Sequence, residues 1–381
     1  MPKVLMVSTV GVTIESFLVP MARGLQDAGW EVHAACRDAV DSGILQEVFD
    51  GVHELYWDRS PADVRGIIAS MSILRKLQDE GGFDVVHLHT PVAAFYGRLA
   101  LQRSRTSGNP RVLYTAHGFH FYEGQGYLPH AAYYAAERMA GRWTDYLITM
   151  NEEDYSAAST FGTIPVDRVR MIHGVGIDTR YYSRESMSVE ACGTVRERHG
   201  IPASAPVILM IAELNKNKRP ESVVRAFLPV GRSTGAHLLL AGDGSLGERC
   251  QKLAFEAGLA QQVHVLGKIA DVRPYICTAL AAVLYSIREG LPRSIMECLS
   301  MEVPVIASDI RGNADLLTGG SGWLVPPKDE TALTQTMLSA IEDPDECRKR
   351  GVAGRILMCG QYEVGTVVEQ YVRLYREALT V

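Results

Sequence analysis

The chain has 381 residues, which at roughly 100–200 residues per domain predicts two domains. Its hydrophobic fraction of 47% and charged fraction of 22% are those of an ordinary globular protein. The net charge of −6 gives no support to a nucleic-acid-binding protein, and no apolar run reaches the ~18 residues that a membrane-spanning helix needs.

Short apolar runs alternate with helix-length segments through the first half of the chain. Strands that are apolar on both faces, with helices between them, predict a parallel sheet covered by helices on both sides. The expected strands are residues 4–9, 31–36, 84–89, 111–116, 145–150 and 169–172, and the expected helices are 18–29, 62–78 and 129–143.

The alternation stops in a polar, proline-containing stretch and then resumes. We expect a first domain at 1–175, a linker and start of the second domain at 176–205, and a second domain at 206–363, with the last segment, 364–381, packing back on the first domain. The second half predicts strands at 207–212, 237–242, 263–267, 282–286, 304–308 and 322–325, and helices at 330–342, 344–357 and 364–378. The fold class is therefore α/β, with two doubly wound, Rossmann-like domains. Such sheets bind ligands beyond the carboxyl ends of their strands, and two of them facing each other would form a central cleft.

The cysteines predict a reducing compartment. There are seven at irregular spacing, with no C-x-x-C pair, so we expect free thiols and no zinc site. The N-terminus MPKVLMVSTV is typical of a strand rather than a signal peptide, which favours a cytoplasmic location. The one D-x-D, Asp343-Pro344-Asp345, is expected to be a helix cap rather than a metal site.

One basic cluster stands out in the first half of the chain. It comprises Arg98, Arg103, Arg105 and Arg111. Two interpretations are open: a solvated helix end, or a contact with anionic lipid headgroups at the inner membrane leaflet.

Two strand ends of the first domain carry candidate residues. The first is followed by Gly11, which could let the backbone turn tightly beside a ligand. It is not a G-x-G-x-x-G loop, and Cys36 ends the second strand where a dinucleotide site needs an acid, so a nicotinamide dehydrogenase is disfavoured. His117 directly follows the strand 111–116 and is expected at the sheet edge, although a structural loop histidine is the alternative. The same loop offers His120, Tyr122 and Glu123.

The second domain offers sites for an anion after its first two strands. Lys216, Lys218 and Arg219 precede a helix, whose free N–H groups and dipole would add to their charge; a solvated basic turn is the alternative. The glycine turn with Gly242 and Gly244 could bring backbone amides close to a phosphate.

The segment REGLPRSIMECL, residues 288–299, is the strongest signal in the chain. Gly290 would turn the chain and Pro292 would begin a helix, whose first N–H groups, near Arg293 and Ser294, suit a phosphate. Glu297 in that helix could accept two hydrogen bonds from a vicinal diol such as a ribose. Glu289 would lie on the other side of the phosphates.

These features together resemble the retaining glycosyltransferases of family 4. The resemblance rests on the E-x7-E pattern of Glu289 and Glu297, the basic turn LNKNKRPE and the strand end YTAHG. It extends over nearly the whole chain and is similar to the bacterial subgroup of exopolysaccharide, capsule and O-antigen synthesis. It implies the GT-B fold, a nucleotide-sugar donor and no cofactor or metal.

The resemblance also implies roles for single residues. Glu297 would bind the ribose, Glu289 the sugar hydroxyls beside the anomeric carbon, and Lys218 the diphosphate. His117 would touch the sugar 6-hydroxyl, Gly11 would lie near the diphosphate and acceptor, and Ile269 near the base. Leu291 belongs to the same donor-binding segment. Glu213 replaces an arginine usual in the wider family. It would repel a diphosphate unless it pairs with Lys216 or Arg219, and Arg293 could supply the missing charge.

The acceptor is expected to be a polyprenyl-diphosphate-linked saccharide, with Arg59 in a first-domain loop near its phosphate and His120, Tyr122 and Glu123 close by. The donor base is expected to be uridine and the sugar a hexose or N-acetylhexosamine. Two alternatives stay open: a nucleotide-sugar 2-epimerase of the same fold, and a non-catalytic subunit that binds a nucleotide sugar.

Overall fold

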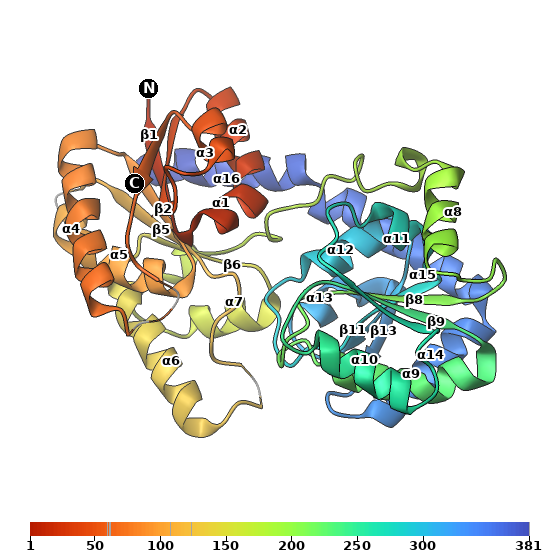
Figure 1. Cartoon of the computed structure of the whole chain (residues 1–381). Coiled ribbons are helices and arrows are strands. Elements are labelled where there is room, and N and C mark those ends of the chain that lie inside the picture. The colour runs from red at the N-terminus through yellow and green to blue at the C-terminus, as the bar shows by residue number, and fades with distance from the viewer. Residues whose placement is uncertain (59, 61, 107, 123, 381) are drawn as a thin grey trace. The chain divides into compact units, whose positions relative to one another are not determined.

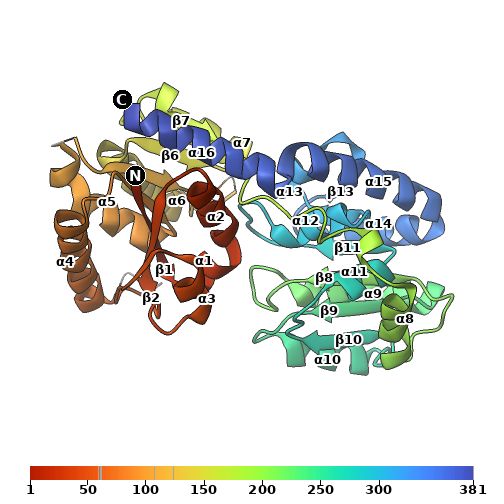
Figure 2. The ribbon, with the colours of Figure 1, turned by 90° about the horizontal axis from the view of Figure 1, so that it is seen from above.

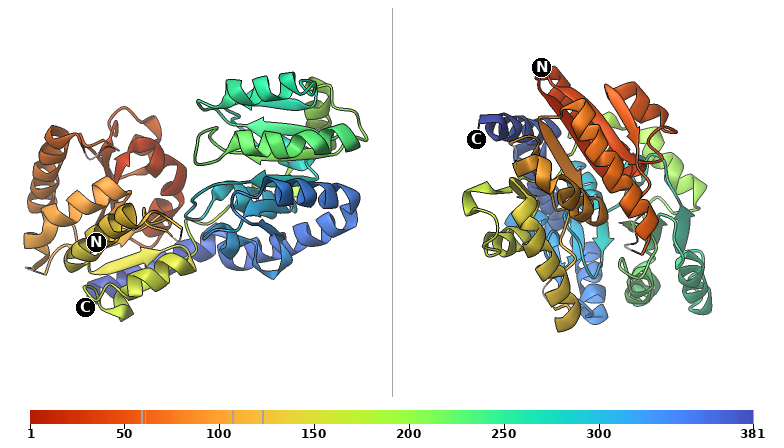
Figure 3. Two further views of the ribbon diagram at one scale, coloured as in Figure 1. Left: turned by 90° about the horizontal axis from the view of Figure 1, so that it is seen from below. Right: turned by 90° about the vertical axis from the view of Figure 1, so that its left-hand side faces the viewer.

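The computed structural model describes residues 1–58, 60, 62–106, 108–122 and 124–380. The chain forms two compact units (Figure 1). One unit contains Met1–Gly176 together with Val364–Val381, and the other contains Ile177–Glu363. Each unit is built on its own parallel sheet with helices on both faces, so the predicted α/β class with two Rossmann-like sheets is confirmed (Figure 1 and Figure 3).

The first unit has a seven-stranded parallel sheet with the order β3-β2-β1-β4-β5-β6-β7. Its central strands carry apolar side chains on both faces because each face is covered by helices, as the uninterrupted apolar runs predicted. The strands are β1 (Lys3–Val10), β2 (Glu31–Arg37), β3 (Gly51–Glu54), β4 (Val85–His89), β5 (Arg111–Thr115), β6 (Tyr146–Thr149) and β7 (Val169–Met171).

The last helix of the chain completes the core of this first unit. This helix, α16 (Val364–Thr380), lies along the first unit (Figure 2). Its buried side chains include Val367, Tyr371, Leu374 and Tyr375. The helices of the unit are α1 (Gly11–Phe17), α2 (Val19–Asp27), α3 (Gly43–Val48), α4 (Val64–Gly81), α5 (Pro91–Thr106), α6 (Tyr127–Ala140), α7 (Glu152–Ser159) and α16 (Val364–Thr380).

The second unit has a six-stranded parallel sheet with the order β10-β9-β8-β11-β12-β13. The strands are β8 (Val207–Ile211), β9 (His237–Ala241), β10 (Val263–Gly267), β11 (Ala281–Leu284), β12 (Val305–Ser308) and β13 (Gly322–Val325). The helices are α8 (Val189–Arg198), α9 (Pro220–Thr234), α10 (Gly247–Glu256), α11 (Arg273–Thr278), α12 (Arg293–Ser300), α13 (Asn313–Leu316), α14 (Glu330–Glu342) and α15 (Pro344–Leu357). Short 3-10 or π-helical turns lie at Gly141–Trp143, Val166–Arg168, Arg184–Ser186, Thr318–Gly320 and Met358–Tyr362.

The segment expected as a linker contributes to the core of the second unit. From Ile177 onward it belongs to that unit, and Ile177, Val195 and Ile201 are buried in its core. The sequence did not predict this, because the three buried apolar residues are separated by many polar residues and prolines. Within the described residues, no helix has both the length and the apolar character needed to cross a bilayer.

The expectation that all seven cysteines are free thiols is wrong for one pair. Cys192 on α8 and Cys277 on α11 form a disulfide across 85 positions of sequence. Spacing along the chain could not reveal it, because the pairing depends on two helices that meet only after folding. The other five cysteines are free, and Cys36, Cys250, Cys298 and Cys347 are buried.

Candidate functional site

A buried ion pair joins two loops at the carboxyl edge of the second sheet. Lys218 follows β8 and Glu289 follows β11, and these strands are neighbours. Lys218 Nζ lies 2.5 Å from Glu289 Oε1, with 21% of the lysine side chain and 9% of the glutamate side chain exposed. The sequence assigned these residues to different parts of a ligand, and the structure brings them into direct contact.

Hydrogen bonds between the two loops hold this pair in place. Asn217 Nδ2 donates to the carbonyl oxygen of Arg288 at 3.0 Å, and the Ile287 N–H donates to the carbonyl oxygen of Asn217 at 2.8 Å. The loop after β8 is also bonded to itself, since the Lys218 N–H donates to Asn215 Oδ1. Sequence reasoning missed Asn217, although it stands beside Lys218 in the basic turn.

Glu297 lies on the buried face of α12 and is held on one oxygen. Its Oε1 accepts a hydrogen bond from the Tyr182 hydroxyl at 2.9 Å and lies 3.1 Å from Arg293 Nε. Oε2 has no hydrogen-bond partner among the described residues. Burial raises the pKa of Glu297, while Arg293 and Tyr182 oppose that shift. Arg293, which the sequence assigned to the diphosphate, contacts Glu297, and Tyr182 was not predicted at all.

A close crossing of two loops fixes the turn before α12. Gly312 follows β12 with φ +75°, and a Cβ there would come within 2.1 Å of the Gly290 carbonyl oxygen. Arg311 is buried and its Nε donates to the Glu289 carbonyl oxygen at 3.2 Å. Pro292 is the N-cap, so α12 begins one residue later than predicted, at Arg293. Leu291 and Ser294 are partly buried in the same turn.

The glycine turn after β9 crosses the loop after β8. A Cβ at Gly242 would lie 1.9 Å from the Ala212 carbonyl oxygen, and one at Gly244 would lie 2.4 Å from that of Leu214. Glu213 is exposed at this crossing, and within the described part of the chain it forms no ion pair, so neither Lys216 nor Arg219 neutralises it there. Ile269 follows β10 and is partly buried against the core.

The first unit gathers histidines at the ends of β4 and β5. His117 follows β5, as predicted, and its Nε2 lies 3.1 Å from His89 Nδ1. Burial lowers the pKa of His117 to about 4. His87 packs below, with its ring centroid 4.0 Å from that of His89. The sequence prediction omitted His87 and His89, although VVHLH places both on one face of a strand.

Gly11 was expected in a tight turn beside a ligand, and the structure places it at the start of a helix. It is the first residue of α1, which follows β1 without a loop. A Cβ at this position would meet its nearest neighbour, the Arg37 carbonyl oxygen, at 3.6 Å, an ordinary contact distance. A larger residue such as alanine would therefore also fit at this helix start, and the local structure does not require glycine.

The structure describes only two of the four residues that were predicted to bind the acceptor. His120 packs against Tyr133 of α6 with ring centroids 5.4 Å apart, and Tyr122 is partly buried. Arg59 and Glu123 lie outside the described residues.

The arginine cluster is only partly exposed. Arg98 is fully buried on α5, where its Nη2 bonds Glu137 at 2.8 Å and its guanidinium stacks 4.2 Å above the Tyr114 ring. Arg105 and Arg111 both face the buried carboxylate of Asp145. Arg103 is exposed, so the cluster is solvated only in part, and its contact with lipid headgroups stays a prediction.

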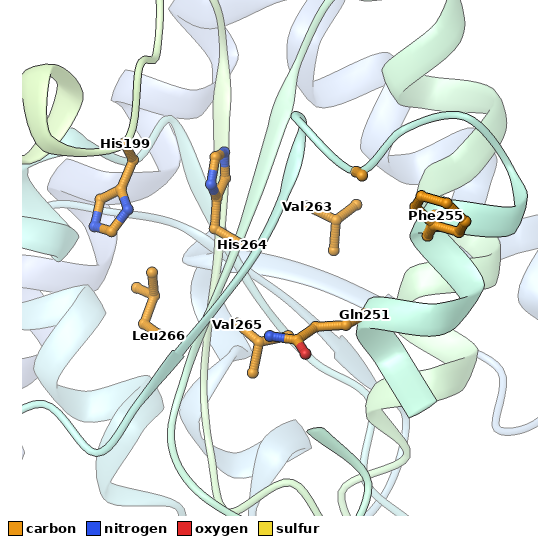
Figure 4. Close-up of a pocket in the computed structure, with 8 residues that line it drawn as sticks. His199, Gln251, Phe255, Val263, His264, Val265 and Leu266 are labelled. Atoms are coloured by element: carbon orange, nitrogen blue, oxygen red, sulfur yellow. The ribbon is translucent and has the colours of Figure 1, made fainter. Parts of the chain in front are cut away.

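A separate cavity of about 500 Å³ lies along the outer edge of the second sheet (Figure 4). It is lined by His199, Gln251, Phe255, Ala260, Val263, His264, Val265 and Leu266, and it contains none of the predicted site residues. Over the described residues, no group of three His, Cys, Asp or Glu side chains could hold a metal ion. Asp343 caps α15 by accepting from the Glu346 N–H, which confirms the predicted helix cap.

The chain is similar in sequence to known proteins over most of its length. The family profile described as glycosyl transferases group 1 matches residues 193–356, and the one described as glycosyltransferase family 4 matches residues 14–181. A Bacillus subtilis (strain 168) protein with the provisional name glycosyltransferase EpsD is 33% identical over 369 residues, covering 96% of this chain and 94% of that protein.

More distant relatives share the fold. The Escherichia coli UDP-Gal:alpha-D-GlcNAc-diphosphoundecaprenol alpha-1,3-galactosyltransferase is 23% identical over 304 residues, covering 77% of this chain and 76% of that enzyme. The crystal structure of Anabaena Alr3699/HepE in complex with UDP superposes with a TM-score of 0.82 at 18% identity, over 99% of this chain and 100% of that one. The two sheets thus have the GT-B arrangement of strands and helices, and the chain belongs to the family of glycosyltransferases that these two profiles describe.

Proposed function

We propose that the protein is a retaining glycosyltransferase of bacterial surface-polysaccharide synthesis. It transfers a hexose or N-acetylhexosamine from a uridine diphosphate sugar to a hydroxyl of a polyprenyl-diphosphate-linked saccharide. The observation that carries this proposal is the Lys218–Glu289 ion pair at the carboxyl edge of the second sheet, together with Glu297 on the helix that follows. The name of the Escherichia coli relative, which includes UDP-Gal and a diphosphoundecaprenol acceptor, supports the choice of substrates.

The proposed nucleotide-sugar donor is complementary to the charged side chains at the carboxyl edge of the second sheet. Glu297 Oε2 is available to accept from ribose hydroxyls, while Tyr182 and Arg293 hold Oε1 in place. The diphosphate attracts Lys218 away from Glu289, so that the same event provides a cation for the leaving group and frees a carboxylate for the sugar hydroxyls. The N–H groups at the start of α12 add to the positive potential.

The reaction follows from where charge develops. As the bond between the anomeric carbon and the phosphate oxygen breaks, the sugar gains oxocarbenium character and the diphosphate gains negative charge, which Lys218 stabilises. The acceptor hydroxyl attacks from the same face, forming the new glycosidic bond with retention, and its proton passes to the departing phosphate oxygen. Lysine and helix N–H groups supply the positive charge in this proposal, without a metal or other cofactor.

Contact with the inner face of the cytoplasmic membrane is proposed through α6. Leu128 is 78% exposed and Met139 is 42% exposed, and Ala132 and Ala135 lie between them on the same exposed face. These four positions carry no charge, whereas a helix face in water normally carries polar side chains. α6 lies at the margin of the first unit (Figure 1).

Replacing both Leu128 and Met139 by glutamate is expected to weaken binding to vesicles that contain anionic lipid by on the order of tenfold or more, because burial of these apolar groups in the interface is lost. Co-sedimentation of the protein with vesicles measures this change. The same substitutions at the exposed Val352 and Ile356 of α15 provide the control. Equal binding of wild type and the α6 variant would exclude this helix as the contact.

Incubation of the protein with UDP-sugars, with and without a polyprenyl-diphosphate-linked saccharide, tests the proposed function. We expect an α-linked product only when both substrates are present, and slow hydrolysis of the donor alone. An epimerised sugar formed from donor alone would identify the 2-epimerase. Tight donor binding without turnover on any acceptor would identify the non-catalytic subunit.

A further inference from the structure

Three histidines, His87, His89 and His117, lie together at the ends of β4 and β5. The proposed function gives no role to His89. His89 is the last residue of β4 and is 1% exposed. Its Nδ1 lies 3.1 Å from Nε2 of His117, the residue expected beside the transferred sugar. One of these two nitrogens must donate the proton of that hydrogen bond, so the tautomer of His89 decides that of His117.

The other nitrogen of His89 shows which one donates. His89 Nε2 is buried and has no hydrogen-bond partner among the described residues. A buried N–H without a hydrogen-bond partner is rarer in proteins than a buried acceptor without one. The proton of His89 therefore belongs on Nδ1, where it is donated to His117 Nε2.

Burial also decides the charge state of the two rings. Burial lowers the pKa of His89 well below its ordinary value and that of His117 to about 4, so both rings are neutral at pH 7.

The side chains packed around His89 restrict the rotation of its ring. His87 packs against it at 4.0 Å between ring centroids, and His87 is itself held by the Tyr375 hydroxyl at 2.5 Å and by Thr115 Oγ1 at 2.8 Å. We propose that His89 is a positioning residue that fixes the orientation and tautomer of His117, so that His117 presents an Nδ1–H donor to a substrate hydroxyl. The substrate part of this inference rests on the proposed function.

Nuclear magnetic resonance of protein with ¹⁵N-labelled histidine reads the tautomer without any substrate. We expect the wild-type spectrum to show His117 protonated on Nδ1 and His89 also protonated on Nδ1. In His89→Leu we expect a mixture of His117 tautomers. A wild-type His117 protonated on Nε2 would overturn the proposal, whatever reaction the protein catalyses.

Steady-state kinetics of His89 variants then distinguish a positioning role of His89 from a role in the stability of the fold alone. His89→Leu is expected to lower kcat by about 10–100-fold with little change in donor KM, the scale known for residues that orient a ligand histidine in metal sites. His89→Asn, whose amide can donate from nearly the same place, is expected to recover most of the lost rate. If His89→Asn is as slow as His89→Leu at equal thermal stability, the positioning role is wrong.

A second histidine pair in the first unit supplies the matched control. His33 Nδ1 and His53 Nε2 lie 2.9 Å apart on β2 and β3, away from His117. His53→Leu removes a comparable contact and should leave kcat unchanged. If the wild type gives no turnover with UDP-sugars and a polyprenyl-diphosphate-linked saccharide, the proposed function fails. The tautomer measured by nuclear magnetic resonance still decides whether His89 positions His117.

Discussion

Lys218→Ala is expected to lower kcat/KM by about 10²–10³-fold, because a preformed cation aimed at the leaving group is lost. Lys218 Nζ lies 2.5 Å from Glu289 Oε1 and only 21% of the lysine side chain is exposed, so its charge acts in a partly dehydrated place. Steady-state kinetics with a UDP-sugar and the lipid-linked acceptor measure this loss. Lys218→Arg should restore only part of the activity, because a planar guanidinium does not match the geometry of an ammonium.

Lys216 offers the matched control in the same loop. It is exposed and two positions from Lys218, and no ion pair involves it among the described residues. Lys216→Ala should change kcat/KM little. A comparable loss for both variants would mean that general positive charge, rather than the Lys218–Glu289 geometry, supports the reaction.

Glu137→Ala is expected to destabilise the first unit by about 3–5 kcal/mol, because the Arg98 guanidinium would remain buried without its carboxylate. Arg98 is fully buried; its Nε bonds the Ala94 carbonyl oxygen and its Nη2 bonds Glu137 Oε2. Hydrogen exchange of the amides of α5 and α6 measures the opening free energy of this unit, without interference from unfolding of the other.

The exposed pair Arg225–Glu330 is the control for this prediction. With 44% and 32% of the side chains exposed, it should contribute about 0–1 kcal/mol, so Glu330→Ala should have a small effect. The double change Arg98→Met with Glu137→Leu should recover much of the stability lost in Glu137→Ala, since no buried charge remains. An equal, small effect of Glu137→Ala and Glu330→Ala would contradict the account of α5.

The alternation of apolar runs and helix-length segments was enough to predict most of both sheets. The strands at 207–211, 237–241 and 263–267 lie where the sequence placed them, because buried parallel strands are apolar on both faces and end in turn residues. α1 and α5 were missed. α1 follows β1 without a turn signal, and the arginines of α5 suggested a surface segment.

The candidate site was predictable as a set of strand ends but not as a set of contacts. Glu289, Glu297 and Lys218 were found because each stands beside a strand end, a glycine turn or a helix start. The contact between Lys218 and Glu289 depends on β8 and β11 being neighbours, although more than sixty residues separate them in the chain. Tyr182 and Arg311 carry no local signal, since a tyrosine or arginine in a loop is usually exposed.

Calorimetric titration of UDP into the wild-type protein and Glu297→Ala tests the central claim, that the carboxyl edge of the second sheet binds the nucleotide. The account predicts saturable binding by the wild type. It also predicts a weakening of about tenfold or more in the variant, the cost of losing hydrogen bonds to a charged acceptor. Absence of UDP binding by the folded wild type, or equal affinity of the two proteins, would contradict it.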